Sequence, residues 1–432
     1  MFGIFFAQNL RFCKWAILLV FSVLIFVFLI CKNKINTLVE NLRLPMRKII
    51  LLCIVLFGTS ISAQNEEHSI IVKDVETQLP VENATIVVLK TKQILLTNKD
   101  GKAVFMLSGG SNIQVSETNY ESLTIRWASL KESDFVIYLN SKDNKLDEVV
   151  LSKQSPQKVL QKIVSNSVHM LAASYRLKVY VKEFFMLDNQ YSYYNDGLVN
   201  FQFVGDQKKA VTTLLVEQNR SYGILDTDVS ADLKGYNLNN IMENYSNLKY
   251  FEPLLNPKAK KEYDFIIKGH SNNKDYYVMT ITPLDKAKEA IDSFEIIYDP
   301  EKKLILEFTI DATPKNIDKI EEKTTVNSKN ITRSFVKVDY RFDGKNYYLL
   351  SSNEEIAYNL ILKDAVKKIQ VRNSFTTTSF NKQNFTYKES DVFKEKSLFN
   401  KKNKILTNYW DISGLTATDE EKAIVSSLEF KM

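Results

Sequence analysis

The sequence predicts a mainly β protein: an N-terminal β-sandwich, a connecting helix and a larger curved antiparallel β-sheet domain, preceded by hydrophobic targeting segments. Short runs rich in Val, Ile, Phe and Tyr recur after residue 64, and turn residues separate them. Aromatic residues make up 12% of the chain, and most are Phe or Tyr, which favour strands. One stretch after residue 155 shows helical periodicity ahead of the longer strands.

The net charge of +6 is confined to the first 63 residues. This region holds seven Lys or Arg residues and one Glu, so the remaining 50 basic and 50 acidic residues balance. Phosphate binding requires a clustered excess of positive charge. The sequence therefore predicts no nucleic-acid partner.

The cysteines follow the same division, because Cys13, Cys31 and Cys53 all precede residue 64. The rest of the chain can form no disulfide, no thiolate metal site and no cysteine nucleophile. We expect it to be stabilised by burial alone.

Two apolar segments open the chain. Trp15–Cys31 is apolar apart from one serine and is long enough to cross a bilayer. The second segment, residues 46–63, has the layout of a secretory signal peptide: a basic start, the apolar core Ile49–Phe57 and small residues ending at Ala63. Cleavage is predicted after Ala63.

A signal peptide that begins at Met46 predicts that Met46 is the true start and that residues 1–45 are an over-extension. The alternative is a membrane anchor at residues 15–31, which would associate the protein with the membrane if it is not cleaved. Both readings place the folded part in the cell envelope, in the periplasm or at the outer membrane.

The first folded domain, residues 68–150, is predicted to be a sandwich of short strands. The sequence Asn98-Lys99-Asp100-Gly101 predicts a turn in which Gly101 adopts a positive φ. The expected strands are Ser69–Lys73, Thr85–Leu89, Val104–Leu107, Ile113–Val115 and Phe135–Leu139.

This domain resembles the carboxypeptidase regulatory-like domain, a small transthyretin-like β-sandwich of exported bacterial proteins. The resemblance is carried by Val72, Asp74, Leu79–Ile86, Thr97–Gly101, Val115–Ser116 and Asn119–Glu121. Ile70 and Asn119 stand where the family usually has glycine. The resemblance implies a structural or interaction role, because domains of this kind contain no peptidase site.

The second folded region, residues 155–432, is predicted to be a helix followed by a β-rich domain of unknown function. Ser155-Pro156 is a helix start, and apolar residues then recur at three- and four-residue spacing as far as Leu171. Thr418–Glu421 is a capping box that predicts a short last helix. The expected strands are Leu177–Met186, Leu198–Val204, Val211–Glu217, Tyr263–Lys268, Tyr276–Thr282, Ser293–Tyr298, Leu304–Ile310, Ser334–Phe342, Tyr347–Ala357 and Val366–Phe380. The meander around Ile266–Ile310 resembles the half-barrel sheets of lipoprotein-carrier proteins.

No catalytic, cofactor-binding or metal residue is predicted. His68, His169 and His270 are about a hundred residues apart, and none has a ligand-like neighbour. Residues 226–232 place Asp, Asp, Ser and Asp at alternate positions, as a calcium loop does. The glycine and glutamate positions of such a loop hold Ala231 and Asn237, so a solvated acidic loop is expected.

These observations favour a non-enzymatic cell-envelope protein with a binding, scaffolding or assembly role. A lipid or lipoprotein carrier is one alternative, and an unrecognised hydrolase is another. The expected partner is an envelope protein or a lipid. The identity of the partner, the oligomeric state and the true start are not fixed by the sequence.

Overall fold

The structure is a computed structural model of the 432-residue chain. It describes residues 66–90, 93–107, 111–117, 120–130, 134–141, 154–205, 210–224, 237–270, 273–285, 287, 292–312, 321–323, 328–362, 365–382, 386–395, 397–401 and 419–429. The predicted membrane segment, the signal peptide and the acidic loop at 226–232 lie outside these ranges. Within them, no helix is both long and apolar enough to cross a membrane.

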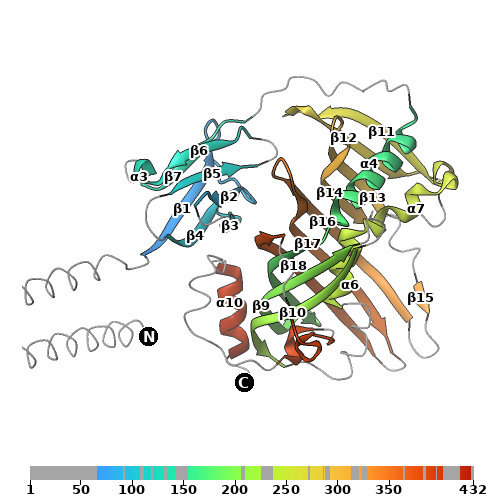
Figure 1. Ribbon diagram of the computed structural model, residues 1–432. Helices are drawn as coiled ribbons and strands as arrows, with labels where there is room; N and C mark the ends of the chain where they lie inside the picture. Colours follow the sequence, from blue (N-terminus) through green and yellow to red (C-terminus); the bar gives the residue numbers. More distant parts are fainter. Residues whose placement is uncertain are drawn as a thin grey trace, which may run out of the picture. The chain divides into compact units, whose positions relative to one another are not determined.

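The N-terminal domain is a sandwich of two small sheets (Figure 1). One sheet has the order β4-β1-β7 and the other β3-β2-β5-β6. Buried aliphatic residues of both sheets form one core, to which Trp127 and Leu130 of α3 also contribute. The elements are β1 (Glu66–Asp74), β2 (Thr85–Val88), β3 (Gln93–Leu96), β4 (Lys102–Leu107), β5 (Asn112–Ser116), β6 (Leu123–Arg126), α3 (Trp127–Leu130) and β7 (Val136–Leu139).

The predicted turn before β4 is confirmed. Gly101 has a φ of +66°, and a Cβ atom there would lie 2.4 Å from the carbonyl oxygen of Val72. Only glycine fits such a close approach in the left-handed region. The Asn98 Oδ1 atom accepts hydrogen bonds from the backbone N–H groups of Asp100 (3.0 Å) and Lys102 (2.9 Å), which fixes the turn.

The larger domain contains an eleven-stranded antiparallel sheet with the order β10-β9-β8-β18-β17-β16-β14-β13-β12-β11, and β15 pairs with β16. The last strand in the sequence, β18, pairs with β8, so the sheet joins the two halves of the domain. The strands are β8 (Tyr175–Leu187), β9 (Gln190–Gly205), β10 (Ala210–Gly223), β11 (Tyr263–His270), β12 (Asn273–Pro283), β13 (Asp292–Asp299), β14 (Leu304–Ala312), β15 (Glu321–Lys323), β16 (Ser328–Phe342), β17 (Tyr347–Ile361) and β18 (Val366–Asn381).

Helices cover one face of this curved sheet, which we call the inner face. The predicted helix is α4 (Pro156–Leu171), and its buried residues Leu160, Ile163, Val164 and Leu171 pack on the sheet. A second group of short helices, which we call the cover (residues 238–261), packs on the same face. The cover consists of α6 (Leu238–Ser246), η3 (Lys249–Phe251), α7 (Glu252–Leu255) and η4 (Pro257–Lys261).

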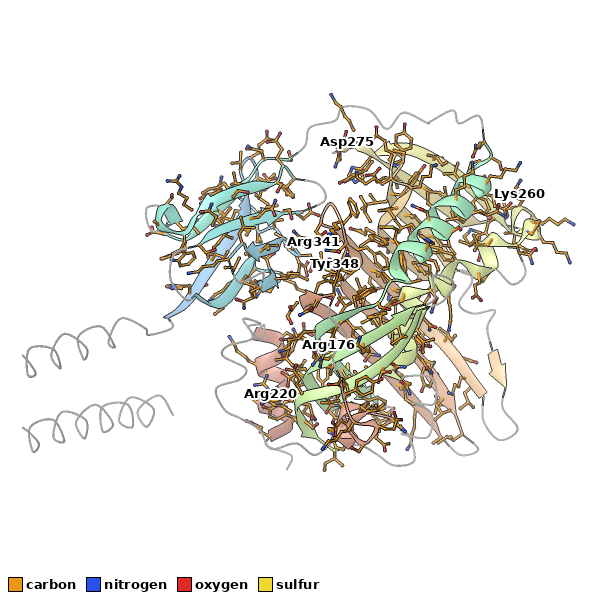
Figure 2. The ribbon with its side chains drawn as sticks, in the orientation of Figure 1. Arg176, Arg220, Lys260, Asp275, Arg341 and Tyr348 are labelled. Atoms are coloured by element: carbon orange, nitrogen blue, oxygen red, sulfur yellow. The ribbon has the colours of Figure 1, made fainter. Side chains whose placement is uncertain are left out.

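The C-terminal segment contacts the other face and the edge of the sheet. Near η5 (Glu389–Asp391), the Phe393 backbone N–H donates to the Leu214 carbonyl oxygen of the edge strand β10 (2.8 Å). Helix α10 (Asp419–Glu429) then packs Ile424 and Leu428 against Phe184 and Tyr194 on the outer face. The outer face of β10 also carries Arg220, which is labelled in Figure 2.

Between these two contacts, residues 397–401 return to the inner face. This segment, which we call the strap, contains η6 (Leu398–Asn400). Leu398 is fully buried in the same apolar core as α4 and the cover. Because strand side chains alternate between faces, strands β8 and β9 carry α10 on one side and the strap on the other.

Candidate functional site

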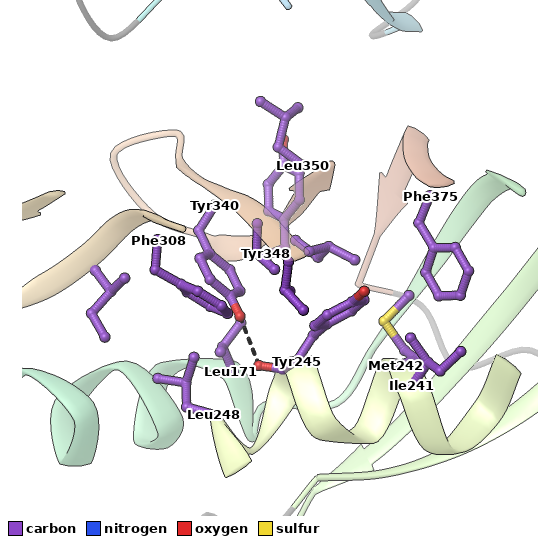
Figure 3. Packing of buried hydrophobic residues seen from close by; sticks show 14 of the residues in the cluster. Leu171, Ile241, Met242, Tyr245, Leu248, Phe308, Tyr340, Tyr348, Leu350 and Phe375 are labelled. Carbon is purple, nitrogen blue, oxygen red and sulfur yellow. Dashed lines mark hydrogen bonds between the residues drawn. The ribbon is translucent and has the colours of Figure 1, made fainter. Parts of the chain in front are cut away.

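The inner face has a large apolar region beneath α4 and the cover. Phe308 and Tyr340, from β14 and β16, pack here against helix residues such as Leu171, Met242 and Tyr245 (Figure 3). The Tyr340 hydroxyl donates to the backbone carbonyl oxygen of Tyr245 (2.8 Å), the hydrogen bond that is dashed in Figure 3. This region positions α6 on the inner face of the sheet, where it contacts β10 and β17.

A second, smaller apolar region lies further along the same face. It contains two aromatic rings that stack in parallel, Phe185 of β8 and Tyr193 of β9, whose centroids are 5.1 Å apart. Its other buried members are Tyr358, Leu360, Ile369 and Val371, from β17 and β18. Phe399 of the strap packs against it.

A row of buried polar side chains separates the two apolar regions. Glu354 of β17 is opposite Asn373 of β18, which is opposite Glu183 of β8, which in turn is opposite Asn195 of β9. All four side chains are buried. We call these four residues the polar row. Because directly opposed residues share a face, the register places carboxyl and amide groups across four neighbouring strands.

At one end of the row, Glu354 links the sheet to the cover. Its carboxyl group accepts hydrogen bonds from the hydroxyl groups of Tyr245 (3.2 Å) and Tyr250 (3.4 Å). Burial raises the pKa of Glu354 to about 7, and the two tyrosine hydrogen bonds only partly offset this effect. The carboxyl group therefore titrates near neutral pH.

Glu183 links the row to the strap. Its Oε2 atom accepts from the Leu398 backbone N–H (2.9 Å), the Ser397 hydroxyl (3.2 Å) and the Asn195 side-chain amide (3.3 Å). Burial raises the pKa of Glu183 to about 7, although these three hydrogen bonds favour the ionised form. Burial thus raises the pKa of both acidic members of the row, Glu183 and Glu354, to about 7.

The strap has two further contacts with the inner face. The Asn219 amide of β10 donates to the carbonyl oxygens of Leu398 (3.1 Å) and Lys401 (3.0 Å). The Leu398 side chain lies over Gly197 of β9, where a Cβ atom would come within 2.7 Å of Leu398 Cδ1. The absence of a side chain at Gly197 therefore creates the space that Leu398 fills.

Two amide oxygens beside the strap accept no hydrogen bond from any described residue. These are Oδ1 of Asn195 and Oδ1 of Asn219, and both side chains are buried. A buried acceptor without a donor costs roughly 1–3 kcal/mol. Such atoms mark a place where a hydrogen-bond donor from another molecule would be favourable.

The described residues of this interior include no buried Lys or Arg side chain. Among the described residues, every fully buried charged side chain is acidic, and no Lys or Arg belongs to that group. Lys329, which lies 5.0 Å from the centre of the Tyr358 ring at the end of the second apolar region, is only partly buried. The polar row therefore offers acceptors and carboxyl groups to a guest molecule, and no buried cation to balance an anion.

The three histidines lie in separate elements. His68 packs on Trp127 of the sandwich (ring centroids 4.5 Å apart), His169 is in the last turn of α4, and His270 ends β11. Within the described ranges, no group of three or more His, Cys, Asp or Glu side chains is arranged to hold a metal ion. The structure therefore does not bring these three histidines together.

Sequence reasoning did not single out Glu183 and Glu354. A usable signal was present, because each is an acidic residue at an inward-facing position of a strand whose other inward residues are mostly apolar. The register that aligns them cannot be read from either strand alone.

No family model matches this chain, and no curated protein matches it. The resemblance of residues 68–150 to the carboxypeptidase regulatory-like domain therefore stays a prediction.

Several solved structures show a remote likeness. A DUF1329 family protein from Desulfovibrio piger is 13% identical over 52% of this chain and 94% of its own, with a TM-score of 0.23. A LolA superfamily protein from Nitrosomonas europaea is 9% identical over 52% of this chain and 94% of its own, with a TM-score of 0.19. Lipovitellin, in a structure titled for its lipid–protein interactions, is 10% identical over 50% of this chain and 26% of its own, with a TM-score of 0.22. TM-scores this low carry no argument about function, so the proposal below rests on this chain's own residues.

Proposed function

We propose that the domain of residues 156–432 binds an amphiphilic molecule, a lipid or a lipid-modified protein, between the inner face of its sheet and the cover, and carries it in the cell envelope. The observation that supports this most is the inner face itself. Two apolar regions flank a buried polar row, which matches a molecule that has both an apolar chain and a polar group.

The way in which the cover is attached supports an interior that can open. Side-chain hydrogen bonds join it to the strands and to α4, including those of Tyr245 and Tyr250 with Glu354. Asn239 of the cover likewise accepts from the Thr212 hydroxyl of β10 (2.6 Å), and Gln157 of α4 donates to the Leu254 carbonyl oxygen (2.9 Å). Contacts of this kind can be released without unpairing any strand.

When the cover lifts, contact of the inner face with an acyl chain is more favourable than contact with water. Lifting the cover would expose apolar side chains of the inner face, and burial of apolar surface is worth about 25 cal/mol per Å². An acyl chain that enters at the same time restores this burial, at about 0.8 kcal/mol for each methylene group. The interior is thus expected to open to an amphiphile and to stay closed in its absence.

The proposal is tested with the purified full-length chain and Nile red, an uncharged dye whose fluorescence rises in apolar surroundings. We expect a saturable rise in fluorescence with the wild type. The variant Tyr245→Phe/Tyr250→Phe lacks both hydroxyl groups that bind Glu354, and should bind the dye several-fold more tightly because its cover opens at lower cost. The matched control Tyr138→Phe, on the exposed surface of the sandwich, should behave like the wild type.

Mass spectrometry of a solvent extract of the same protein gives a second readout. We expect co-purified lipid in stoichiometric amount. The proposal is overturned if neither the wild type nor the double variant binds Nile red and the extract contains no lipid.

A further inference from the structure

The strap contacts the inner face as a bound ligand would. It presents a backbone N–H and a hydroxyl group to Glu183, a carbonyl oxygen to Asn219 and an aliphatic side chain to the space above Gly197. We propose that the strap is a displaceable internal stand-in for the ligand, and that its site takes an uncharged amphiphile with hydroxyl donors, of the monoacylglycerol class. This inference rests on the function proposed above and names the ligand class for that same interior.

The hydrogen-bonding groups of the site determine which head group fits. Glu183 is already an acceptor for two donors of the strap, and Asn195 and Asn219 each have an amide oxygen without a donor. A head group with two hydroxyl groups would replace the Ser397 hydroxyl and the Leu398 N–H, and could also reach one of the amide oxygens. Satisfying a buried acceptor is the main gain in such an exchange.

The charges of the site determine which head groups are rejected. An anionic head group would face the carboxyl groups of Glu183 and Glu354 without a buried Lys or Arg among the described residues. A buried anion without a partner is strongly disfavoured. Burial raises the pKa of Glu183 to about 7. At a pH below this value the carboxyl group is uncharged and gives an ammonium head group no counter-charge, whereas it still forms hydrogen bonds with an uncharged head group.

The strap contacts both apolar regions, which determines where an apolar chain would lie. Leu398 belongs to the large apolar region, and Phe399 packs on the smaller one. The strap therefore contacts both of the apolar regions that lie on either side of the polar row. An acyl chain that replaced Leu398 over Gly197 would continue directly into the large apolar region. The head group and the first carbons of the ligand would then coincide with the strap.

The test uses full-length protein and displacement of Nile red by three probes: 1-monooleoylglycerol, oleate and oleylamine. Leu398→Ala removes the side chain over Gly197 and unseats the strap, so 1-monooleoylglycerol should bind roughly tenfold more tightly than to the wild type. Ile424→Ala removes an equally buried aliphatic side chain from α10 on the outer face, and should change this affinity less than about twofold. At pH 8, oleate should bind the Leu398→Ala variant at least about tenfold more weakly than 1-monooleoylglycerol does.

Each outcome decides one of the two proposals. If the wild type and Leu398→Ala bind the dye and all probes alike, the strap is not a stand-in, although the carrier function stands. If oleate or oleylamine binds as tightly as 1-monooleoylglycerol, the ligand class is wrong. If no variant binds the dye or any probe, both proposals fall. Should Leu398→Ala not fold, Phe399→Ala unseats the strap from the smaller apolar region and gives the same comparison.

Discussion

Glu183 and Asp196 are buried carboxyl groups on the neighbouring strands β8 and β9, on opposite faces of the sheet. Asp196, on the outer face, accepts hydrogen bonds from the Tyr180 hydroxyl (2.6 Å), the Tyr194 hydroxyl (3.2 Å) and both Nε (2.8 Å) and a terminal nitrogen of Arg220. Glu183, on the inner face, accepts three hydrogen bonds from described residues, all from uncharged donors, and two of these donors belong to the strap.

The contrast separates a structural carboxyl group from one that is suited to binding. A buried carboxylate whose two oxygens accept hydrogen bonds from one guanidinium group has its charge balanced within the fold. The Asp196 hydrogen bonds raise the pKa of Arg220, against the effect of its own burial. Among the described residues, Glu183 and Glu354 accept hydrogen bonds from no cation. Two of the three donors to Glu183 come from the strap, which is not part of the sheet, and the third is Asn195 of β9. Our proposal therefore treats the partners of Glu183 as exchangeable and those of Asp196 as permanent.

The largest effect is expected on the outer face. Arg220→Met leaves Asp196 buried without its cation, and should lower the free energy of unfolding by about 3 kcal/mol or more, because a buried charge that loses its partner is strongly destabilising. Urea unfolding measures the change. Lys394→Met breaks the exposed pair with Glu389 (3.0 Å) and should cost less than about 0.5 kcal/mol. Equal effects of the two variants would remove the distinction between the faces.

Glu354 on the inner face should make the stability of the protein depend on pH. The pKa of Glu354 is raised from 4.5 to about 7 in the folded protein, so the folded state binds the proton more tightly than the unfolded state does. The wild type has the full benefit of this binding below pH 4.5 and loses it as the pH rises through 7. Relative to Glu354→Gln, the free energy of unfolding of the wild type should fall by about 3 kcal/mol between pH 4 and pH 8.

Unfolding curves of the wild type and Glu354→Gln at several pH values check this prediction. Parallel stability profiles would mean that the Glu354 carboxyl group ionises as readily inside the fold as in the unfolded chain. In that case the inner face would not carry the uncompensated carboxyl group on which the contrast with Asp196 depends.

The sequence was sufficient to predict the strands because their signals are local. The ten expected strands of the larger domain all lie within strands of the structure, and α4 begins at Pro156 as its N-terminal signal predicts. The expected strands do not include β3, β6 and β15, which have four, four and three residues. Helix α6 was missed although Leu238, Ile241, Met242 and Tyr245 have helical spacing, because nine residues with three asparagines resemble a loop.

The candidate site could not be predicted in the same way, because it depends on pairings between distant strands. Glu354 and Glu183 belong to one row only because β18 pairs with both β17 and β8. The strap, which contacts Glu183, comes from a segment near the C-terminus that has no periodic pattern of its own. Histidines and acidic loops attract attention in a sequence, whereas an acidic residue on a buried strand face becomes informative only once its neighbours are known.

The smallest expected effect concerns the fit between Gly197 and the strap. Gly197→Ala places a methyl group within 2.7 Å of Leu398 Cδ1 and should destabilise the protein by about 1–2 kcal/mol. In the Leu398→Ala background the nearest obstructing atom is absent, and the contacts with the Gln218 carbonyl oxygen (3.1 Å) and Asn219 Cβ (3.3 Å) remain. The same substitution should therefore cost about 1 kcal/mol less in that background. The coupling in this double-mutant cycle is therefore expected to be about 1 kcal/mol. Additive effects would mean that Leu398 does not occupy the space above Gly197 in solution. The strap would then not be an internal stand-in for a ligand, and the contrast between Glu183 and Asp196 would lose its basis.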